Sequence, residues 1–240
     1  MRYLIMHRTT ARWEAGAIPD AALVARVGEM IGGWAKAGSF IAGEGLRPSS
    51  EGVRLRFAAG TRAVVNGPFA GDNELPAGFD ILRATSIDDA VDWATRQAGI
   101  LGDGEVDIRP VTEPWDIGVR PPPAELRTRR YMVLRKASAA TEAGLAPTAA
   151  QRAGLARLIE DTMRTGVHLA AEMIRPSRRG RRYRNARDGV SMFDGPFLET
   201  KELVGGYVVV KADSIEDAHP LALEYISVVE AEEVDLRELE

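Results

Sequence analysis

The second half of this chain repeats the first at a constant offset of 128 positions, with no gap. The matches include Arg2 with Arg130, Gly38 with Gly166, Glu44 with Glu172, and Gly67-Pro68-Phe69 with Gly195-Pro196-Phe197. Two related units follow, 1–113 and 130–240, and the linker 114–129 contains three consecutive prolines that favour an extended spacer. Because there are only two copies, the chain is a duplicated domain and not a solenoid.

Both units show the same order of apolar patterns. Short apolar runs predict strands, and apolar residues at helical spacing predict two helices in each unit. In the first unit we expect strands at 3–6, 40–46, 53–57, 63–66, 79–82 and 106–108. In the second unit we expect them at 131–134, 168–174, 182–185, 190–194, 207–210 and 234–236. Asp20 and Thr148 stand at N-cap positions, and Ser86 and Ser214 begin sequences that resemble capping boxes.

This order of elements predicts the fold class. A strand-helix-strand unit, a hairpin and a second strand-helix-strand unit are typical of a ferredoxin-like α+β arrangement. The helices of each copy would cover one face of its sheet and leave the other apolar face to the sheet of the second copy. We therefore expect two ferredoxin-like repeats that form a pseudo-dimeric α+β barrel within one chain, with a cavity between the sheets. Pairing of whole chains into a homodimer stays open.

Composition narrows the chemistry and the compartment. The 240 residues include no cysteine, which excludes disulfides, thiol nucleophiles and thiolate metal sites and fits a reducing compartment. No run of 18 apolar residues occurs, and the first ten residues do not resemble a signal peptide. We expect a cytoplasmic protein without a membrane span.

Charge is distributed unevenly along the chain. Residues 120–187 hold 16 basic and 5 acidic side chains, whereas residues 188–240 hold 3 and 14. The basic block includes an arginine cluster between Arg178 and Arg187, in which Arg182 and Arg184 align with Arg54 and Arg56. This alignment favours a solvated sheet edge, and capture of an anionic ligand or an acidic protein is the alternative. The block has little aromatic interleaving, so a nucleic-acid partner is not favoured.

One segment of the second unit carries a specific motif. Residues 194–202 read Asp-Gly-Pro-Phe-Leu-Glu-Thr-Lys-Glu, which resembles the Asp-Gly-Pro-Phe-Ala-Glu-Thr-Lys-Glu signature of the YCII-related (DGPF-domain) family at eight of nine positions. The Pro-Ser elements at 48–49 and 176–177 and the Gly-Gly-Tyr strand entry at 205–207 are also similar to that family. The resemblance implies dimeric α+β barrels and, in some members, lyase or dehydrochlorinase-type chemistry with His and Asp.

The first unit departs from this motif. Asn66 stands where the second unit has Asp194, and Gly71-Asp72-Asn73 replaces Glu-Thr-Lys. An amide cannot exchange a proton near neutral pH, so only the second unit retains a possible acid at this position. Asp194 either exchanges protons or orients a ligand, or it fixes the turn through local hydrogen bonds. Asn66 would make similar local bonds, and we also expect it to contact a ligand.

Further candidates lie in the strands at 40–46 and 168–174. Alternation would place Glu44 on the same face as Phe40, and Glu172 on the same face as His168. A carboxylate on an inward face must be hydrogen-bonded or protonated, so each Glu either lines a cavity as an acid or forms a structural salt bridge. His168 is either a buried structural imidazole or a base tuned by Glu172 or Asp194.

We expect Pro196, Phe197 and Tyr207 to contact a ligand, as Glu44 and Asn66 would in the first unit. The three histidines lack a ligand-like spacing, so no metal site is expected, and no cofactor motif is present. The first hypothesis is a cofactor-independent YCII-like enzyme, a lyase or isomerase in which Asp194 and His168 exchange protons and Glu172 orients the imidazole. The alternatives are a non-catalytic ligand-binding or regulatory protein-interaction module and, by analogy of fold alone, a cofactor-free monooxygenase.

Overall fold

The computed structural model describes residues 1–69, 71, 74–197 and 201–240. The first repeat contains β1 (Arg2–Arg8), α1 (Ala11–Glu14), α2 (Ala21–Lys36), β2 (Phe40–Gly45), the 3-10 turn η1 (Ser49–Glu51), β3 (Val53–Ala58), β4 (Thr61–Asn66), β5 (Pro76–Ala84), α3 (Ile87–Leu101) and β6 (Gly104–Pro110). The second contains β7 (Arg129–Lys136), α4 (Ala139–Glu142), α5 (Ala149–Arg164), β8 (His168–Met173), η2 (Ser177–Arg179), β9 (Arg181–Ala186), β10 (Gly189–Asp194), β11 (Val204–Lys211), α6 (Ile215–Val228) and β12 (Glu233–Glu238).

Local sequence signals account for where α2, α3 and α5 begin. The Asp20 carboxylate accepts a hydrogen bond from the Leu23 amide at the start of α2. Thr148 forms a complete capping box at α5, and Ser86 forms one at α3. The short helices α1 and α4 and both 3-10 turns were not expected, because elements of three or four residues have no readable periodicity.

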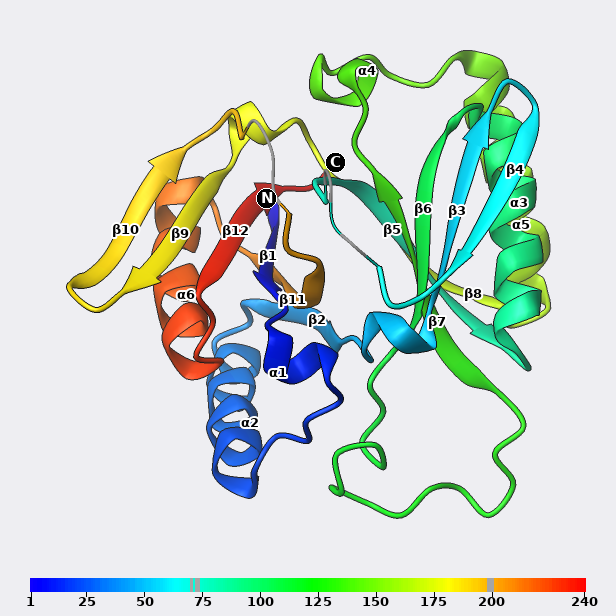
Figure 1. Cartoon of the computed structure of the whole chain (residues 1–240). Coiled ribbons are helices and arrows are strands. Elements are labelled where there is room, and N and C mark those ends of the chain that lie inside the picture. Colours follow the sequence, from blue (N-terminus) through cyan, green and yellow to red (C-terminus); the bar gives the residue numbers. More distant parts are fainter. Residues whose placement is uncertain (70, 72–73, 198–200) are drawn as a thin grey trace.

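Strands of the two repeats are exchanged between two six-stranded antiparallel sheets (Figure 1). One sheet has the order β10-β9-β12-β1-β11-β2 and the other has the order β4-β3-β6-β7-β5-β8. The first repeat therefore contributes β1 and β2 to the sheet that holds the hairpin β9–β10, and the second contributes β7 and β8 to the other sheet. The expectation of one sheet per repeat was wrong, although the α+β class and the order of elements agree with the structure.

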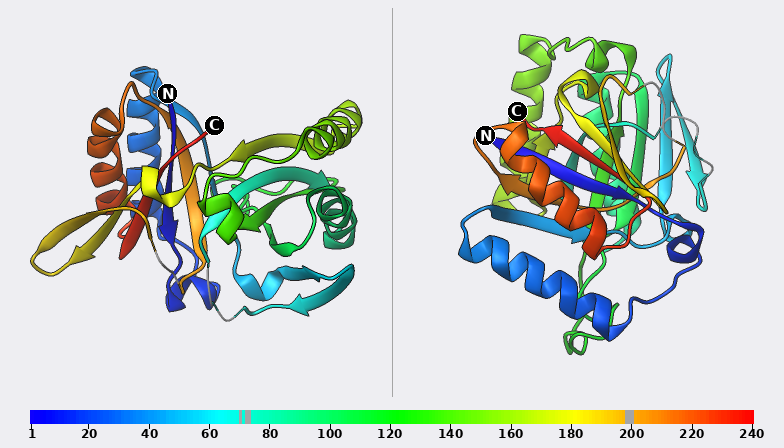
Figure 2. Two further views of the ribbon diagram at one scale, coloured as in Figure 1. Left: turned by 90° about the horizontal axis from the view of Figure 1, so that it is seen from above. Right: turned by 90° about the vertical axis from the view of Figure 1, so that its left-hand side faces the viewer.

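The layers follow from the faces of the two sheets (Figures 1 and 2). Helices α2 and α6 cover the outer face of the first sheet around Ile5 and Val210, and α3 and α5 cover the outer face of the second around Leu82 and Val133. A third apolar cluster lies between the sheets and takes side chains from both. It includes Leu4, Met6, Phe79, Ile81, Met132, Leu134, Tyr207 and Val209. Packed side chains therefore occupy the space where we expected a cavity.

Two β-bulges change the faces predicted for the candidate residues. The register of β5 and β8 pairs Ile81 with Ala170 but Leu82 with His168, so one extra residue intervenes in β8. The pairing of β11 with β2 shifts in the same way between Val209 and Val210. An extra residue reverses the alternation, so His168 and Phe40 lie on helix-covered faces whereas Glu172 and Glu44 lie on the faces between the sheets. Simple alternation was wrong here.

Among the described residues, no helix is both long and apolar enough to cross a bilayer.

Candidate functional site

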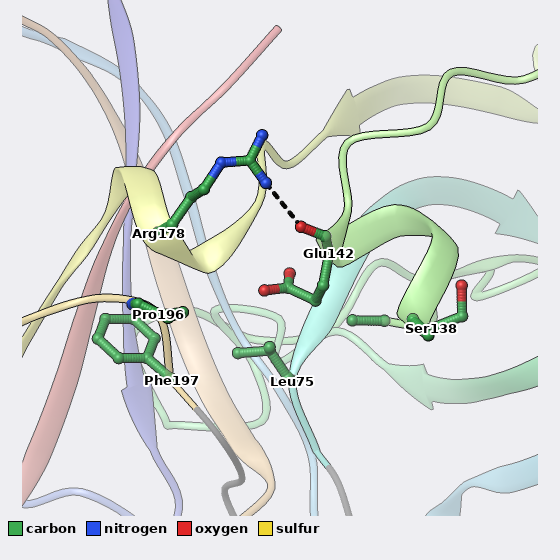
Figure 3. A pocket seen from close by; sticks show the side chains of 8 residues that line it. Leu75, Ser138, Glu142, Arg178, Pro196 and Phe197 are labelled. Carbon is green, nitrogen blue, oxygen red and sulfur yellow. Dashed lines mark hydrogen bonds between the residues drawn. The ribbon is translucent and has the colours of Figure 1, made fainter.

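A pocket of about 430 Å³ lies beside the Gly-Pro-Phe turn of the second repeat (Figure 3). Its walls come from both sheets: η2 and the turn lie on one side, and α4 and the residue before β5 lie on the other. The lining residues are Leu75, Ala137, Ser138, Ala139, Glu142, Arg178, Pro196 and Phe197. Two of the expected ligand contacts, Pro196 and Phe197, therefore reach a pocket.

Close backbone packing holds this turn in place. The Gly195 amide donates to the Gly180 carbonyl at 3.0 Å, and a Cβ on Gly195 would lie 1.8 Å from the carbonyl oxygen of Ser177. The Phe197 amide donates to the Ser177 hydroxyl at 3.0 Å, and that hydroxyl donates to the Glu142 carboxylate. There is therefore no room for a side chain at position 195. The hydrogen bonds through Ser177 connect the turn, η2 and α4.

A buried ion-pair network lies under the turn. The Arg182 guanidinium lies over the Phe197 ring, with its Cζ 4.4 Å from the ring centroid, and it donates to both oxygens of Asp235 at 2.6 and 2.9 Å. Arg8 from the first repeat donates to the same carboxylate. Burial alone would raise the pKa of Asp235, but Arg8 and Arg182 outweigh it, so this pKa lies below its usual value. Arg182 is thus a buried structural cation, and its prediction as solvated was wrong.

The first repeat contains the matching network. Arg54 donates to Asp107 at 2.6 and 2.8 Å and to Glu74 at 2.9 and 3.0 Å, and its Cζ lies 4.7 Å from the centroid of the Phe69 ring. Lys136 stands where the other network has Arg8, and burial among the neighbouring arginines lowers its pKa well below the usual value. Because both repeats keep these contacts, we assign the network to stabilising the Gly-Pro-Phe turn. It does not explain how the two repeats differ.

The charge of the pocket is what distinguishes the second repeat. Arg178 aligns with Ser50 of the first repeat, so the guanidinium in this pocket wall has no counterpart at the equivalent position of that repeat. Its Nη1 donates to the Glu142 carbonyl at 2.8 Å (Figure 3), and no carboxylate of the described residues lies within ion-pair distance of it. The Glu142 carboxylate is occupied by the Ser177 amide and hydroxyl. Arg178 is therefore the pocket's available charged group.

Asp194 does not line this pocket. Its side chain is 73% exposed, and its carboxylate accepts from Arg181 at 3.1 Å. Asn66, its counterpart, is exposed at the end of β4 opposite Val53. Residues Leu198, Glu199 and Thr200 of the motif lie outside the described residues.

His168 lies in the other sheet from Asp194. Its Nε2 is 3.0 Å from Asp80 Oδ1, and its ring stacks on Trp93 with 5.5 Å between centroids. Gln97 donates to the second Asp80 oxygen at 2.7 Å, and Asp80, Gln97 and His168 are all buried. The structure thus brings His168 together with Asp80, and it does not bring the expected trio of Asp194, His168 and Glu172 together.

Glu44 and Glu172 join the two sheets through reciprocal ion pairs. Arg2 of β1 donates to Glu172 of β8 at 2.6 Å, and its repeat counterpart Arg130 of β7 donates to Glu44 of β2. Burial raises the pKa of both carboxyl groups, and the partner arginines act against that rise. Tyr207 is buried near this layer, its ring centroid 4.6 Å from that of Phe79. These three expected site residues therefore lie away from the motif pocket.

Sequence reasoning missed Glu142 and the network partners Arg8 and Asp235, whereas it named Arg178 and Arg182 in the arginine cluster, with capture of an anionic ligand as the alternative to a solvated sheet edge. One usable signal was present: Glu14, Ser49 and Arg109 recur as Glu142, Ser177 and Arg237 at the repeat offset. Among the described residues, no group of three or more His, Asp or Glu is placed to hold a metal ion.

Comparison with protein-family models matched one family in both repeats. The YCII-related domain matches residues 1–115 and again residues 130–237. Comparisons with curated proteins and with solved structures gave no match. The paired matches coincide with the internal repeat and with its two Gly-Pro-Phe turns. The chain is a tandem member of the YCII-related family.

Proposed function

We propose that this YCII-related protein binds a small organic anion in the motif pocket of its second repeat. The observation that carries the proposal is Arg178, a cation in the wall of a pocket of about 430 Å³. The first repeat has Ser50 at the equivalent position. Leu75, Pro196 and Phe197 supply the apolar wall beside it. A guanidinium binds carboxylate or phosphate oxygens in pairs, so an aliphatic carboxylate fits this combination.

The architecture supports the same proposal. The reciprocal pairs of Arg2 with Glu172 and Arg130 with Glu44 relate the two halves by an approximate two-fold. On this basis we regard the chain as a pseudo-dimeric α+β barrel closed within one molecule. The two motif turns then occupy equivalent positions, and one has become specialised by its cation.

The test compares Arg178→Ser with the parent protein by calorimetric titration with hexanoate and with neutral hexanol. We expect hexanoate to bind the parent, and Arg178→Ser to weaken it by about tenfold or more, because a charge-assisted hydrogen bond is lost. The matched control is Arg157→Ser, which removes an exposed arginine that does not line the pocket. Equal hexanoate affinity in the parent and Arg178→Ser would reject the site.

Acid–base catalysis of elimination, dehydration or isomerisation is the second candidate function. The Glu142 carboxylate lines the same pocket as Arg178 and accepts the Ser177 hydroxyl, so in this second candidate function Glu142 would be the general acid or base. Asp194 would then fix the turn, and His168 would stabilise the core. The test is release of chloride from chlorinated carboxylates: turnover by the parent that Glu142→Gln abolishes supports catalysis, and turnover that survives Glu142→Gln rejects this role.

A further inference from the structure

A second pocket, of about 560 Å³, lies between the linker and the edge of the second sheet. Its lining extends from Glu113 to Arg130 along the linker and includes Arg83 of β5 and Leu169 of β8. Five of the residues that line it are arginines and only two are acidic.

Three of the five arginines already have acidic partners. Arg130 donates to both oxygens of Glu113 at 2.8 and 2.9 Å, Arg129 donates to Asp116 at 2.5 Å, and Arg127 pairs with Glu125. The pairs of Arg129 with Asp116 and of Arg130 with Glu113 hold the two ends of the linker near each other. They leave little of that charge for a ligand.

Arg83 and Arg120 have no carboxylate within ion-pair distance in the part of the chain that the structure describes. Arg83 stands directly opposite Arg130 in the register of β5 and β7, on the same face of the sheet. Arg130 is already paired with Glu113 and Glu44, so the exposed Arg83 is the cation of this opposed pair that is open to a ligand.

Aromatic and apolar groups stand beside these cations. The Arg120 Cζ lies 5.7 Å from the centroid of the Trp115 ring, and the exposed side chains of Leu126 and Leu169 lie in the same pocket. The buried Trp115 Nε1 has no hydrogen-bond partner among the described residues.

From these contacts we infer that the linker pocket is a second ligand site, which binds a small aromatic anion between Arg83, Arg120 and Trp115. Its carboxylate or phosphate group would pair with the two guanidinium groups, and its ring would pack against the indole and the leucines. The site is separate from the motif pocket, because the two share no lining residue. The linker is thus part of a binding site as well as a spacer between the repeats.

The test titrates the full chain with benzoate, phenyl phosphate and neutral benzyl alcohol, and follows tryptophan fluorescence and heat. Trp115 lines this pocket and no tryptophan lines the motif pocket, so the fluorescence change reports on the linker site. We expect at least one of the anions to bind, binding to weaken as salt is added, and Trp115→Phe to remove the fluorescence change while heat is still released. Preference for phenyl phosphate or for benzoate identifies the head group.

Variants locate the binding. Arg83→Gln and Arg120→Gln should each lower the affinity for the anion by about tenfold or more. The control Arg157→Gln, which removes an exposed arginine outside the pocket, should leave that affinity unchanged. Arg83→Lys keeps the positive charge but loses the planar guanidinium, so its affinity for the anion should lie between those of the parent and Arg83→Gln. Circular dichroism verifies that each variant is folded. The inference is overturned if neither anion binds, if benzyl alcohol binds equally well, or if Arg178→Ser removes the binding instead.

Discussion

The Arg182 guanidinium lies between the ring of Phe197 and the carboxylate of Asp235, 4.4 Å from the ring centroid and 2.6 Å from the nearer oxygen. This contact connects the family motif to the buried interior of the first sheet. The two aspartates therefore differ in role: Asp235 is buried in the ion-pair network, whereas Asp194 of the motif is exposed.

Asp235→Ala should destabilise the protein strongly. The substitution leaves Arg182 and Arg8 as buried cations without this partner, which costs about 3–5 kcal/mol. Asp194→Ala is the matched control, and it should change the free energy of unfolding by no more than about 1 kcal/mol, because its ion pair with Arg181 is exposed. Urea unfolding of both variants provides the comparison, and equal losses would contradict the assignment of the two roles.

Gly195→Ala should destabilise the turn because its Cβ would lie 1.8 Å from the Ser177 carbonyl oxygen. We expect a loss of about 1–3 kcal/mol or more, as for other overpacked positions. Gly99→Ala in α3 has no atom within 4 Å of the added methyl group and should be neutral or stabilising. Thermal unfolding measures both, and a Gly195→Ala protein as stable as the parent would show that the turn tolerates a side chain.

His168→Phe should test whether His168 and Asp80 act as one buried unit. The single substitution removes the ring partner of Asp80 and should cost about 1–3 kcal/mol. Asp80→Val combined with His168→Phe introduces the residues that stand at the equivalent positions of the other sheet, Val208 and Phe40. The double variant should lose less stability than the sum of the single losses. Additive losses in urea unfolding would argue against coupling.

His7 should make the fold more sensitive to acid. Burial, together with the charges of Arg8 and Arg109, lowers the pKa of His7 from 6.5 to about 4. Between these values the unfolded chain binds the proton and the folded chain does not, so the stability contributed by neutral His7 is complete above pH 6.5 and is lost as the pH falls towards 4.

In the middle of that window, His7 contributes a slope of about 1.4 kcal/mol per pH unit to the free energy of unfolding. The Nδ1 of His7 lies 2.9 Å from the Tyr225 hydroxyl, so His7→Gln keeps a polar group there and removes the titration. Urea unfolding at several pH values should show a shallower acid dependence in His7→Gln than in the parent. Parallel curves would exclude His7 as the source.

The sequence by itself determined the duplication, the order of elements, the helix caps and the position of the motif turn. The helix caps are local features, since an N-cap such as Asp20 binds an amide three residues away. The repeat offset also identified which residues the two halves share.

Only the tertiary structure decided which strands pair and which candidates meet. The two repeats offer nearly equivalent edges, so periodicity cannot specify whether β1 joins β5 of its own repeat or β11 of the other. One bulge in β8 then moved His168 to the helix-covered face, beside Asp80 of the other repeat, and left Glu172 between the sheets. Strand exchange likewise brought Arg178 of the second repeat and Leu75 of the first to the walls of one pocket. A local sequence pattern does not encode such a contact, because contacts between distant segments depend on strand pairing and register.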